Sequence, residues 1–139
     1  MIILDTNVLS ALMQPERNPQ VVAWLDGQPR TSVWTTSVSV METRFGIELL
    51  PDGHRKTRLG SDFAALVSEI LSARIVPLDT AAAEIAGTLA ATRRKAGLNV
   101  DIQDTQIAAI ALSRNATLAT RNKRRFQDTG LTLVNPWVG

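Results

Sequence analysis

The chain of 139 residues has no cysteine and only one histidine, His54. The lack of cysteine excludes disulfides, thiolate nucleophiles and cysteine zinc sites, and it fits a reducing cytoplasm. The single histidine excludes a metal-free ribonuclease that works with a pair of histidines. A serine hydrolase is poorly supported, because its nucleophile needs a base partner that the sequence does not offer.

Long apolar runs are also missing. No stretch reaches the length of a membrane helix, and the first residues lack the basic region and apolar run of a signal peptide. We therefore expect a cytoplasmic protein with no membrane segment. The 45% share of hydrophobic residues predicts one globular domain over residues 1–139.

The charge balance is small, but the basic residues are clustered. There are 15 basic and 13 acidic residues, a net charge of +2, which does not by itself indicate a nucleic-acid partner. Two dense basic runs stand out, at residues 93–95 and 121–125. The simpler interpretation of the first run is a solvated helix end.

Apolar patterning predicts alternating strands and helices. Strands are expected at residues 2–4, 31–36, 74–78, 117–120 and 131–134. Helices are expected at 8–13, from 18 onward, and at 37–50, 62–73, 80–95 and 101–112, with a polar loop at 54–61. This alternation predicts an α/β fold whose parallel sheet is covered on both faces.

The first predicted strand ends in a carboxylate. Ile2, Ile3 and Leu4 predict a strand buried on both faces, and Asp5 follows at its carboxyl end. Open parallel sheets bind ligands at that edge. Asp5 or Asn7 can equally be the N-cap of the next helix, so this motif alone leaves capping and chemistry open.

The helix predicted at 37–50 carries Glu42. Its apolar residues recur at three- and four-residue steps, so Val38, Met41, Phe45 and Leu49 are expected to line one face, with Glu42 beside it. Glu42 can reach the sheet edge from there. The alternative is a capping box, because Ser39-x-x-Glu42 matches that pattern.

The helix predicted at 101–112 is nearly uncharged after its first turn, and its start holds Asp101 and Asp104. The helix dipole favours a negative charge at this end. One aspartate suffices as a cap, which leaves the other available. Asp79, before the helix at 80–95, is interpreted as a cap only.

Asp5, Glu42 and Asp104 are therefore expected at one edge of the sheet. Three converging carboxylates repel one another unless a cation neutralises them, and hard oxygen ligands select Mg²⁺ or Mn²⁺. Such a site suits phosphodiester hydrolysis by a metal-activated water. A phosphoaspartyl phosphatase with Asp5 as nucleophile is disfavoured, because Asn7 stands where a second aspartate is needed.

An ordered set of motifs resembles a known family over essentially the whole chain. The motifs are Leu4-Asp5-Thr6-Asn7-Val8, Glu42 with Gly46, Asp104-x-x-Ile107-Ala108-Ala109-x-Ala111, Ala119-Thr120-Arg121-Asn122-x-x-x-Phe126, and Asn135-Pro136-Trp137. Together they resemble the PIN-domain ribonucleases, and among these the VapC and FitB toxins of bacterial toxin–antitoxin pairs.

The resemblance implies a three-layer α/β/α domain and a Mg²⁺- or Mn²⁺-dependent endoribonuclease acting on RNA. It also implies a homodimer inhibited by an antitoxin with a DNA-binding domain, so that DNA is reached only through the antitoxin. By matching position, Asp5, Asp104 and Glu42 correspond to the metal-binding and catalytic acids of the family. Thr6 corresponds to a threonine that supports the first aspartate, and Thr120 is expected to act similarly.

One position departs from the family pattern. A fourth acid is often present where this chain has Asn122 or Arg125. Asn122 can bind a metal-bound water but brings no charge, so a second metal is expected to bind more weakly. Arg121, Arg124 and Arg125 can contact RNA or the antitoxin, or they can be solvated residues of a bend. The alternative function is therefore a catalytically weak subunit that mainly binds the antitoxin in a DNA-bound autoregulatory complex.

Overall fold

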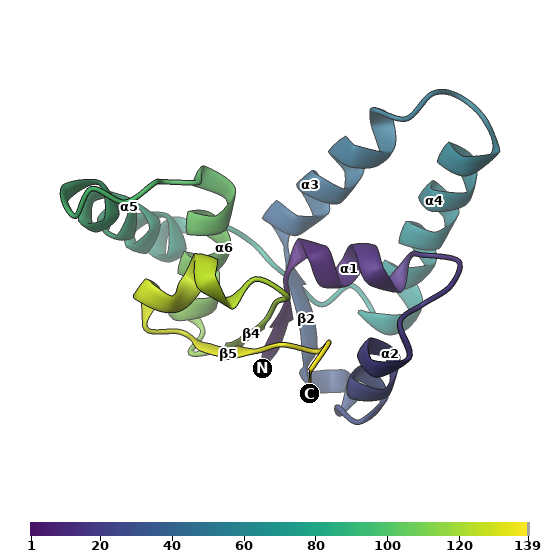
Figure 1. Cartoon of the computed structure of the whole chain (residues 1–139), viewed down its shortest axis with the longest axis horizontal. Coiled ribbons are helices and arrows are strands. Elements are labelled where there is room, and N and C mark those ends of the chain that lie inside the picture. The colour runs from purple at the N-terminus through teal and green to yellow at the C-terminus, as the bar shows by residue number, and fades with distance from the viewer. Residues whose placement is uncertain (139) are drawn as a thin grey trace.

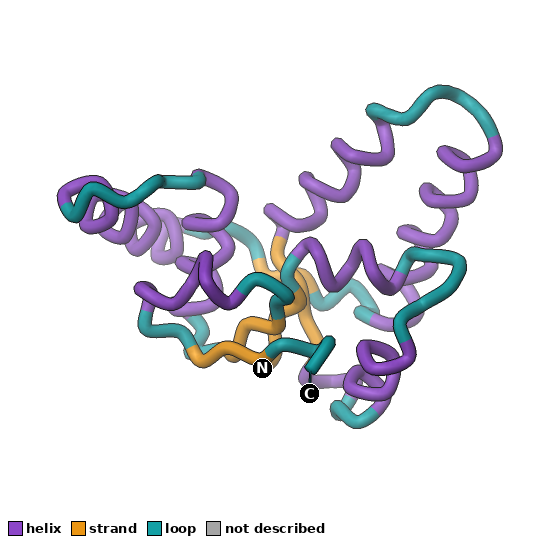
Figure 2. Tube along the Cα trace, viewed as in Figure 1, coloured by secondary structure: helices purple, strands orange, loops and turns teal. Residues whose placement is uncertain are grey.

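The computed structural model describes residues 1–138, so Gly139, the last residue of the predicted domain, lies outside the described residues. Five parallel strands form one sheet in the order β3-β2-β1-β4-β5. They are β1 (Ile2–Leu4), β2 (Val33–Thr36), β3 (Ile75–Val76), β4 (Thr117–Ala119) and β5 (Thr132–Val134). Figure 2 shows the strands at the centre with helices around them. The predicted α/β fold is confirmed.

Six helices complete the fold (Figure 1). They are α1 (Thr6–Leu12), α2 (Pro19–Asp26), α3 (Ser37–Glu48), α4 (His54–Ala65), α5 (Thr80–Lys95) and α6 (Ile102–Ser113). One apolar core lies among α1, α2 and α4, and a second lies under α5 and α6. The sheet therefore separates two helical layers, as expected. No helix within residues 1–138 combines the length and apolarity needed to cross a bilayer.

The first strand is the centre of the sheet. It pairs with β2 on one side and β4 on the other, with Ile2 opposite both Val33 and Thr117. Ile3 and Leu4 are fully buried, and they belong to the two different cores because successive strand residues face opposite sides. The strand order reverses between β1 and β4, which is where open α/β sheets bind their ligands.

The four apolar residues that we expected on one face of α3 do not form a buried face. Of its four residues only Val38 is buried, while Met41, Phe45 and Leu49 are exposed, Phe45 by 64%. The helix instead buries Ser39 and Thr43. Both hydroxyls have partners, since Ser39 bonds Thr36 and Thr43 donates to the Ser39 carbonyl. Hydroxyls that have hydrogen-bond partners can be buried at little cost. The polar residues of α3 therefore do not identify its solvent-exposed face.

The predicted loop at 54–61 is also wrong, because α4 begins at His54 and continues into a wider helical turn at Leu66–Ile70. Its first half lacks an apolar period, and pairs four residues apart support it, such as Arg58 with Asp62 at 3.1 Å. Other differences are shifts of element ends. The helix α1 starts at Thr6, Arg30–Ser32 is a 3-10 turn before β2, and β3 has only two residues.

Candidate active site

Asp5 lies at the end of the central strand and is 5% exposed. One carboxylate oxygen accepts from the Thr6 backbone N–H at 2.8 Å, which makes Asp5 the N-cap of α1. The other oxygen accepts from the Thr120 hydroxyl at 2.8 Å, from the end of β4. Burial raises the pKa of Asp5, the bonds from Thr120 and Thr6 oppose that rise, and repulsion by Glu42 adds to it. Capping and site building thus use different oxygens of one carboxylate.

Glu42 extends from the second turn of α3 and is half-buried. The capping-box alternative is wrong, because the N-cap of α3 is Thr36, whose hydroxyl accepts from the Ser39 N–H at 3.0 Å. The carboxylate of Glu42 instead accepts from the Thr6 hydroxyl at 2.8 Å. Burial raises the pKa of Glu42. The hydrogen bond from Thr6 opposes this rise, and repulsion by Asp104 adds a smaller rise. Thr6 therefore links the two acids, because its backbone N–H donates to Asp5 and its hydroxyl donates to Glu42.

Asp104 is freed by its neighbour Asp101. Asp101 is the N-cap of α6 and accepts from the Asp104 backbone N–H at 2.9 Å, so the Asp104 side chain has no capping duty. Burial raises the pKa of Asp104 to about 6, with repulsion by Asp101 and then Asp5 adding to the rise. Arg125 opposes this shift, since its guanidinium lies 3.4 Å from the Asp104 carboxylate. The predicted separation of roles between the two aspartates agrees with this geometry.

The three acids share one electrostatic environment. Glu42 raises the pKa of Asp5, Asp104 raises that of Glu42, and Asp5 raises that of Asp104. Within residues 1–138, however, no three acidic or histidine side chains lie close enough to hold one ion together. Mg²⁺ usually keeps several waters and takes one or two carboxylates. The donor chemistry therefore fits a hydrated Mg²⁺ or Mn²⁺ and does not form a closed protein cage.

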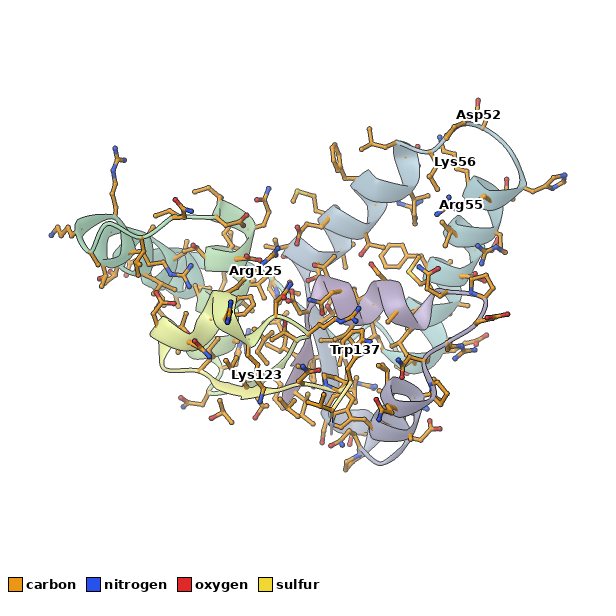
Figure 3. All side chains as sticks on the ribbon, in the orientation of Figure 1. Asp52, Arg55, Lys56, Lys123, Arg125 and Trp137 are labelled. Carbon is orange, nitrogen blue, oxygen red and sulfur yellow. The ribbon has the colours of Figure 1, made fainter. Side chains whose placement is uncertain are left out.

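The basic run at 121–125 follows β4 and leads into 3-10 turns at Lys123–Thr129. Its arginines line two different cavities. Arg124 and Arg125 line a cavity of about 440 Å³ beside Asp104, whereas Arg121 lies over the Trp137 ring at 5.0 Å. In Figure 3, Arg125 lies near α6 and Trp137 lies below α1. Asn122 is exposed and donates its backbone N–H to the Thr120 hydroxyl at 3.1 Å.

The interpretation of the first basic run as a solvated helix end is wrong for Arg93, which is 5% exposed. Its guanidinium forms a two-bond pair with Asp128, at 2.8 and 2.9 Å, and donates to the Arg125 carbonyl at 2.7 Å. It also reaches the Thr105 hydroxyl at 3.3 Å. Arg93 thus ties the basic turn to α5 and α6. One signal was available, because Arg93 lies four residues after the partly buried Leu89 on the same helix face.

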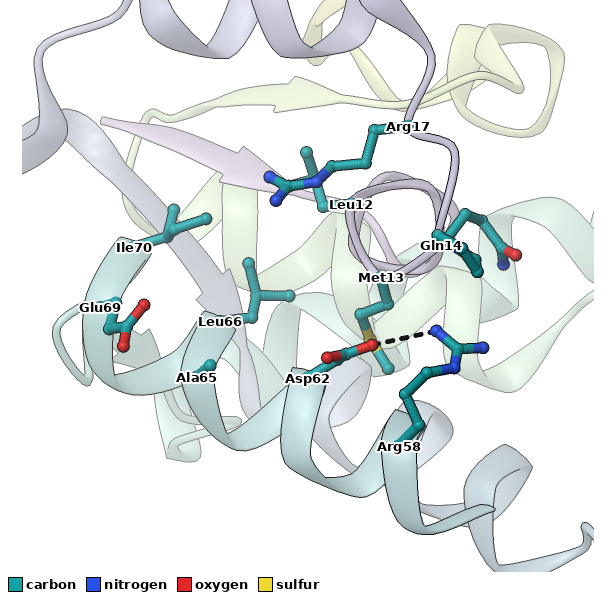
Figure 4. A pocket seen from close by; sticks show the side chains of 11 residues that line it. Leu12, Met13, Gln14, Arg17, Arg58, Asp62, Ala65, Leu66, Glu69 and Ile70 are labelled. Atoms are coloured by element: carbon teal, nitrogen blue, oxygen red, sulfur yellow. Dashed lines mark hydrogen bonds and ion pairs between the residues drawn. The ribbon is translucent and has the colours of Figure 1, made fainter. Parts of the chain in front are cut away.

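A further cavity, of about 340 Å³, lies between the end of α1 and α4 (Figure 4). Its rim holds the ion pair of Arg58 and Asp62, and Leu12, Met13 and Leu66 form part of its wall. None of the three acids lines it. This cavity therefore does not belong to the acidic site.

Comparison with known proteins places the fold in a family. The family model for the PIN domain matches residues 2–131. VapC ribonuclease Y4jK of Sinorhizobium fredii is 34% identical over 137 residues, covering 99% of this chain and 98% of that protein. Toxin FitB of Neisseria gonorrhoeae is also 34% identical over 137 residues, covering 99% of both chains.

A solved structure agrees. The structure of FitAB bound to an IR36 DNA fragment contains a chain that superposes on this one with a TM-score of 0.88 at 34% identity. The match covers 99% of this chain and 96% of the other. Sequence motifs, strand order and global superposition point to the same conclusion. This chain belongs to the PIN-domain family.

Proposed function

We propose that this protein is the toxin of a toxin–antitoxin pair and acts as a metal-dependent endoribonuclease. Asp5, Glu42 and Asp104 would hold Mg²⁺ or Mn²⁺. The observation that carries the proposal is the placement of these acids at the strand-order reversal, where each raises the pKa of another. A cation is the ligand that such a site gains most from binding.

The residues around the acids would prepare them for this role. Thr120 and the Thr6 N–H fix both oxygens of Asp5, and the Thr6 hydroxyl orients Glu42. A bound ion would lower the pKa of an attacking water and stabilise charge on the phosphoryl oxygens. Asn122 would support a metal-bound water only through its neutral amide, so a second ion would bind weakly.

The basic turn would bind the partner or the substrate. Arg121, Arg124 and Arg125 are exposed, and guanidinium groups can bind RNA phosphates or an antitoxin carboxylate. We also propose a homodimer and a cognate antitoxin with a DNA-binding domain. The FitAB complex bound to DNA supports this assembly, in which DNA contact would come through the antitoxin. The cytoplasmic location stays a prediction.

The test is cleavage of a mixed cellular RNA pool by the purified protein, free of antitoxin, with Mg²⁺ or Mn²⁺. EDTA and an Asp5→Asn, Asp104→Asn double variant serve as controls. Metal-dependent fragments with 5′-phosphates, absent from both controls, are the expected result. Equal cleavage by the double variant would contradict the assignment of these acids.

A second function is favoured by one observation, the pairing of Arg125 with Asp104 at 3.4 Å. An internal cation on a metal-binding acid would weaken catalysis and leave antitoxin binding as the main activity. In that case Asp5→Ala and Asp104→Ala variants would retain antitoxin binding and promoter repression while growth arrest is already absent from the wild type. Growth arrest that depends on Asp5 and Asp104 would support the nuclease instead.

A further inference from the structure

A cavity of about 310 Å³ opens on the α1 side of the acids. Arg121 and Trp137 form one wall, and Asn7, Gln14, Glu16 and Asn18 contribute polar side chains to the others. It shares no lining residue with the cavity that Arg125 lines. Nothing in the site described above uses Trp137.

The arginine and the tryptophan form a stack that is fixed from both ends. The guanidinium carbon of Arg121 lies 5.0 Å from the centre of the Trp137 ring. The ring is partly buried against the apolar core of α1 and α2, whereas Arg121 is exposed, so Arg121 is the outer member of the stack. Asn135 bridges the two backbones, accepting from the Trp137 N–H at 2.9 Å and donating to the Arg121 carbonyl at 3.5 Å.

One residue connects this cavity to the acids. The side-chain oxygen of Asn7 accepts a hydrogen bond from the backbone N–H of Arg121 at 3.3 Å. Its amide nitrogen faces the other way, 3.5 Å from the Asp5 carboxylate and 3.4 Å from the Thr120 hydroxyl. A phosphate bound at the acids would therefore have its neighbouring nucleotide beside this cavity.

The chemistry of the cavity suits a nucleobase. Guanidinium planes and aromatic rings are the surfaces on which single-stranded bases stack, and amide side chains pair with base edges. None of the ion pairs within residues 1–138 uses Arg121. An apolar peptide side chain would gain little from a wall of arginine, amides and the Glu16 carboxylate.

We propose that this cavity is a base-binding subsite for the nucleotide next to the scissile phosphate, with Arg121 stacking on the base and Trp137 supporting Arg121. The proposal rests on the proposed nuclease function, since it needs RNA at the acids. Specificity would then come in part from which base fits beside Gln14 and Asn18.

The experiment compares two fluorescein-labelled 12-nucleotide RNAs in EDTA, one of random sequence and one in which every base is removed. Fluorescence anisotropy gives the affinity of the full chain for each. The wild type should prefer the RNA with bases by about tenfold, the size expected for one stacked base. Arg121→Ala and Trp137→Leu should both lose that preference. Arg94→Ala, which removes an equally exposed positive charge elsewhere, should keep it.

Each outcome decides the matter. Variants that keep the preference, or that weaken both RNAs equally, would overturn the subsite and make Arg121 a phosphate contact only. Loss of antitoxin binding with an unchanged base preference would assign the cavity to the antitoxin and also overturn it. Circular dichroism checks that Trp137→Leu folds, and the exposed Arg121→Ala tests the proposal independently. A wild type that shows the preference but cleaves no RNA would contradict the nuclease, and the cavity would then bind a base with no scissile phosphate beside it.

Discussion

Two groups of charges in this fold have opposite arrangements. Arg93 and Asp128 form a matched pair with two short bonds, and the hydrogen bond from Arg93 lowers the pKa of Asp128. Asp5, Glu42 and Asp104 are like charges with one ion-pair partner among them within residues 1–138, Arg125, and we call them the unmatched group. Burial first, and then repulsion between acids, raises the pKa of each. The first arrangement lowers the free energy of the folded chain without a ligand. The second is unfavourable until something positive binds.

The difference teaches where to look for function in this fold. Buried charges that satisfy one another are structural, whereas buried charges that repel one another at a sheet edge indicate a missing ligand. Arg125 belongs to both groups, because its carbonyl is held by Arg93 and its guanidinium reaches Asp104. Arg93 thus helps to position Arg125. Within residues 1–138, Arg125 is the only cation that forms an ion pair with Asp5, Glu42 or Asp104.

The largest expected effect comes from removing an unmatched charge. Asp104→Asn should lower RNA cleavage at least about a hundredfold, because a ligand of the metal is lost. The same change should raise the melting temperature at pH 7.5, because a carboxylate that is buried and repelled by other acids becomes neutral. Cleavage of a defined RNA and a thermal melt measure the two. Glu84→Gln, at an exposed position of α5, is the control, and a destabilised Asp104→Asn would contradict the contrast.

Breaking the matched pair should have a large effect of opposite sign on stability. Arg93→Ala leaves Asp128 and the Arg125 carbonyl without their donor, and it should lower the free energy of unfolding by about 3 kcal/mol. Arg94→Ala, one residue away and exposed, should change it by less than about 0.5 kcal/mol. Urea denaturation gives both numbers. Equal losses for the two variants would show that Arg93 is not special.

The free energy of unfolding should depend on pH in opposite directions for Asp104 and for Asp128. The pKa of Asp104 is about 6 in the folded chain and near 3.8 when unfolded, so between these values the folded state binds more protons. Its contribution to stability therefore falls as pH rises from about 4 to 6. Asp128, whose pKa is lowered, contributes stability above its unfolded pKa that is lost as pH falls. Denaturation midpoints measured against pH test both statements. Asp104→Asn should lose the decrease in stability that the wild type shows between about pH 4 and pH 6, and Asp128→Asn should lose the decrease that the wild type shows as pH falls below about 3.8.

The smallest effect should come from adding a charge to the unmatched group. Asn122→Asp restores a fourth acid near Thr120 and should tighten Mn²⁺ binding several-fold, because charge adds to the ligand set. Isothermal titration of Mn²⁺ into the antitoxin-free protein measures this. Asn122→Gln keeps the amide and should leave the affinity unchanged. An unaltered affinity in Asn122→Asp would place residue 122 outside the reach of the ion.

The sequence was informative where local rules and burial agree. Ile2 to Leu4 predicted a strand buried on both faces because they are apolar on both faces. Asp101 and Asp104 together predicted one free aspartate, because a single cap suffices. It failed where tertiary contacts decide. The orientation of α3 depends on hydroxyl partners of Ser39 and Thr43, and the burial of Arg93 depends on Asp128, 35 residues away.

The sequence predicted that the three acids lie near one sheet edge and that Thr120 supports Asp5, but it did not predict how Thr6 divides its hydrogen bonds. Asp5, Glu42 and Asp104 follow from strand ends and helix starts, which are local. The hydroxyl of Thr6 bonds Glu42, and only its backbone N–H bonds Asp5. The sequence does not predict this division. Trp137 was noted as part of a terminal motif, but its stacking on Arg121 needs the fold.

The sheet order also bears on biosynthesis. The central strand is synthesised before one of its two neighbours, β4, and the Thr120 hydroxyl that holds Asp5 lies 115 residues later in the chain. This pairing must wait until β4 has been synthesised. A chain truncated before residue 117 thus lacks the hydroxyl that holds one oxygen of Asp5. The Asp5 carboxylate is therefore fixed only after folding has joined segments that are far apart in the sequence.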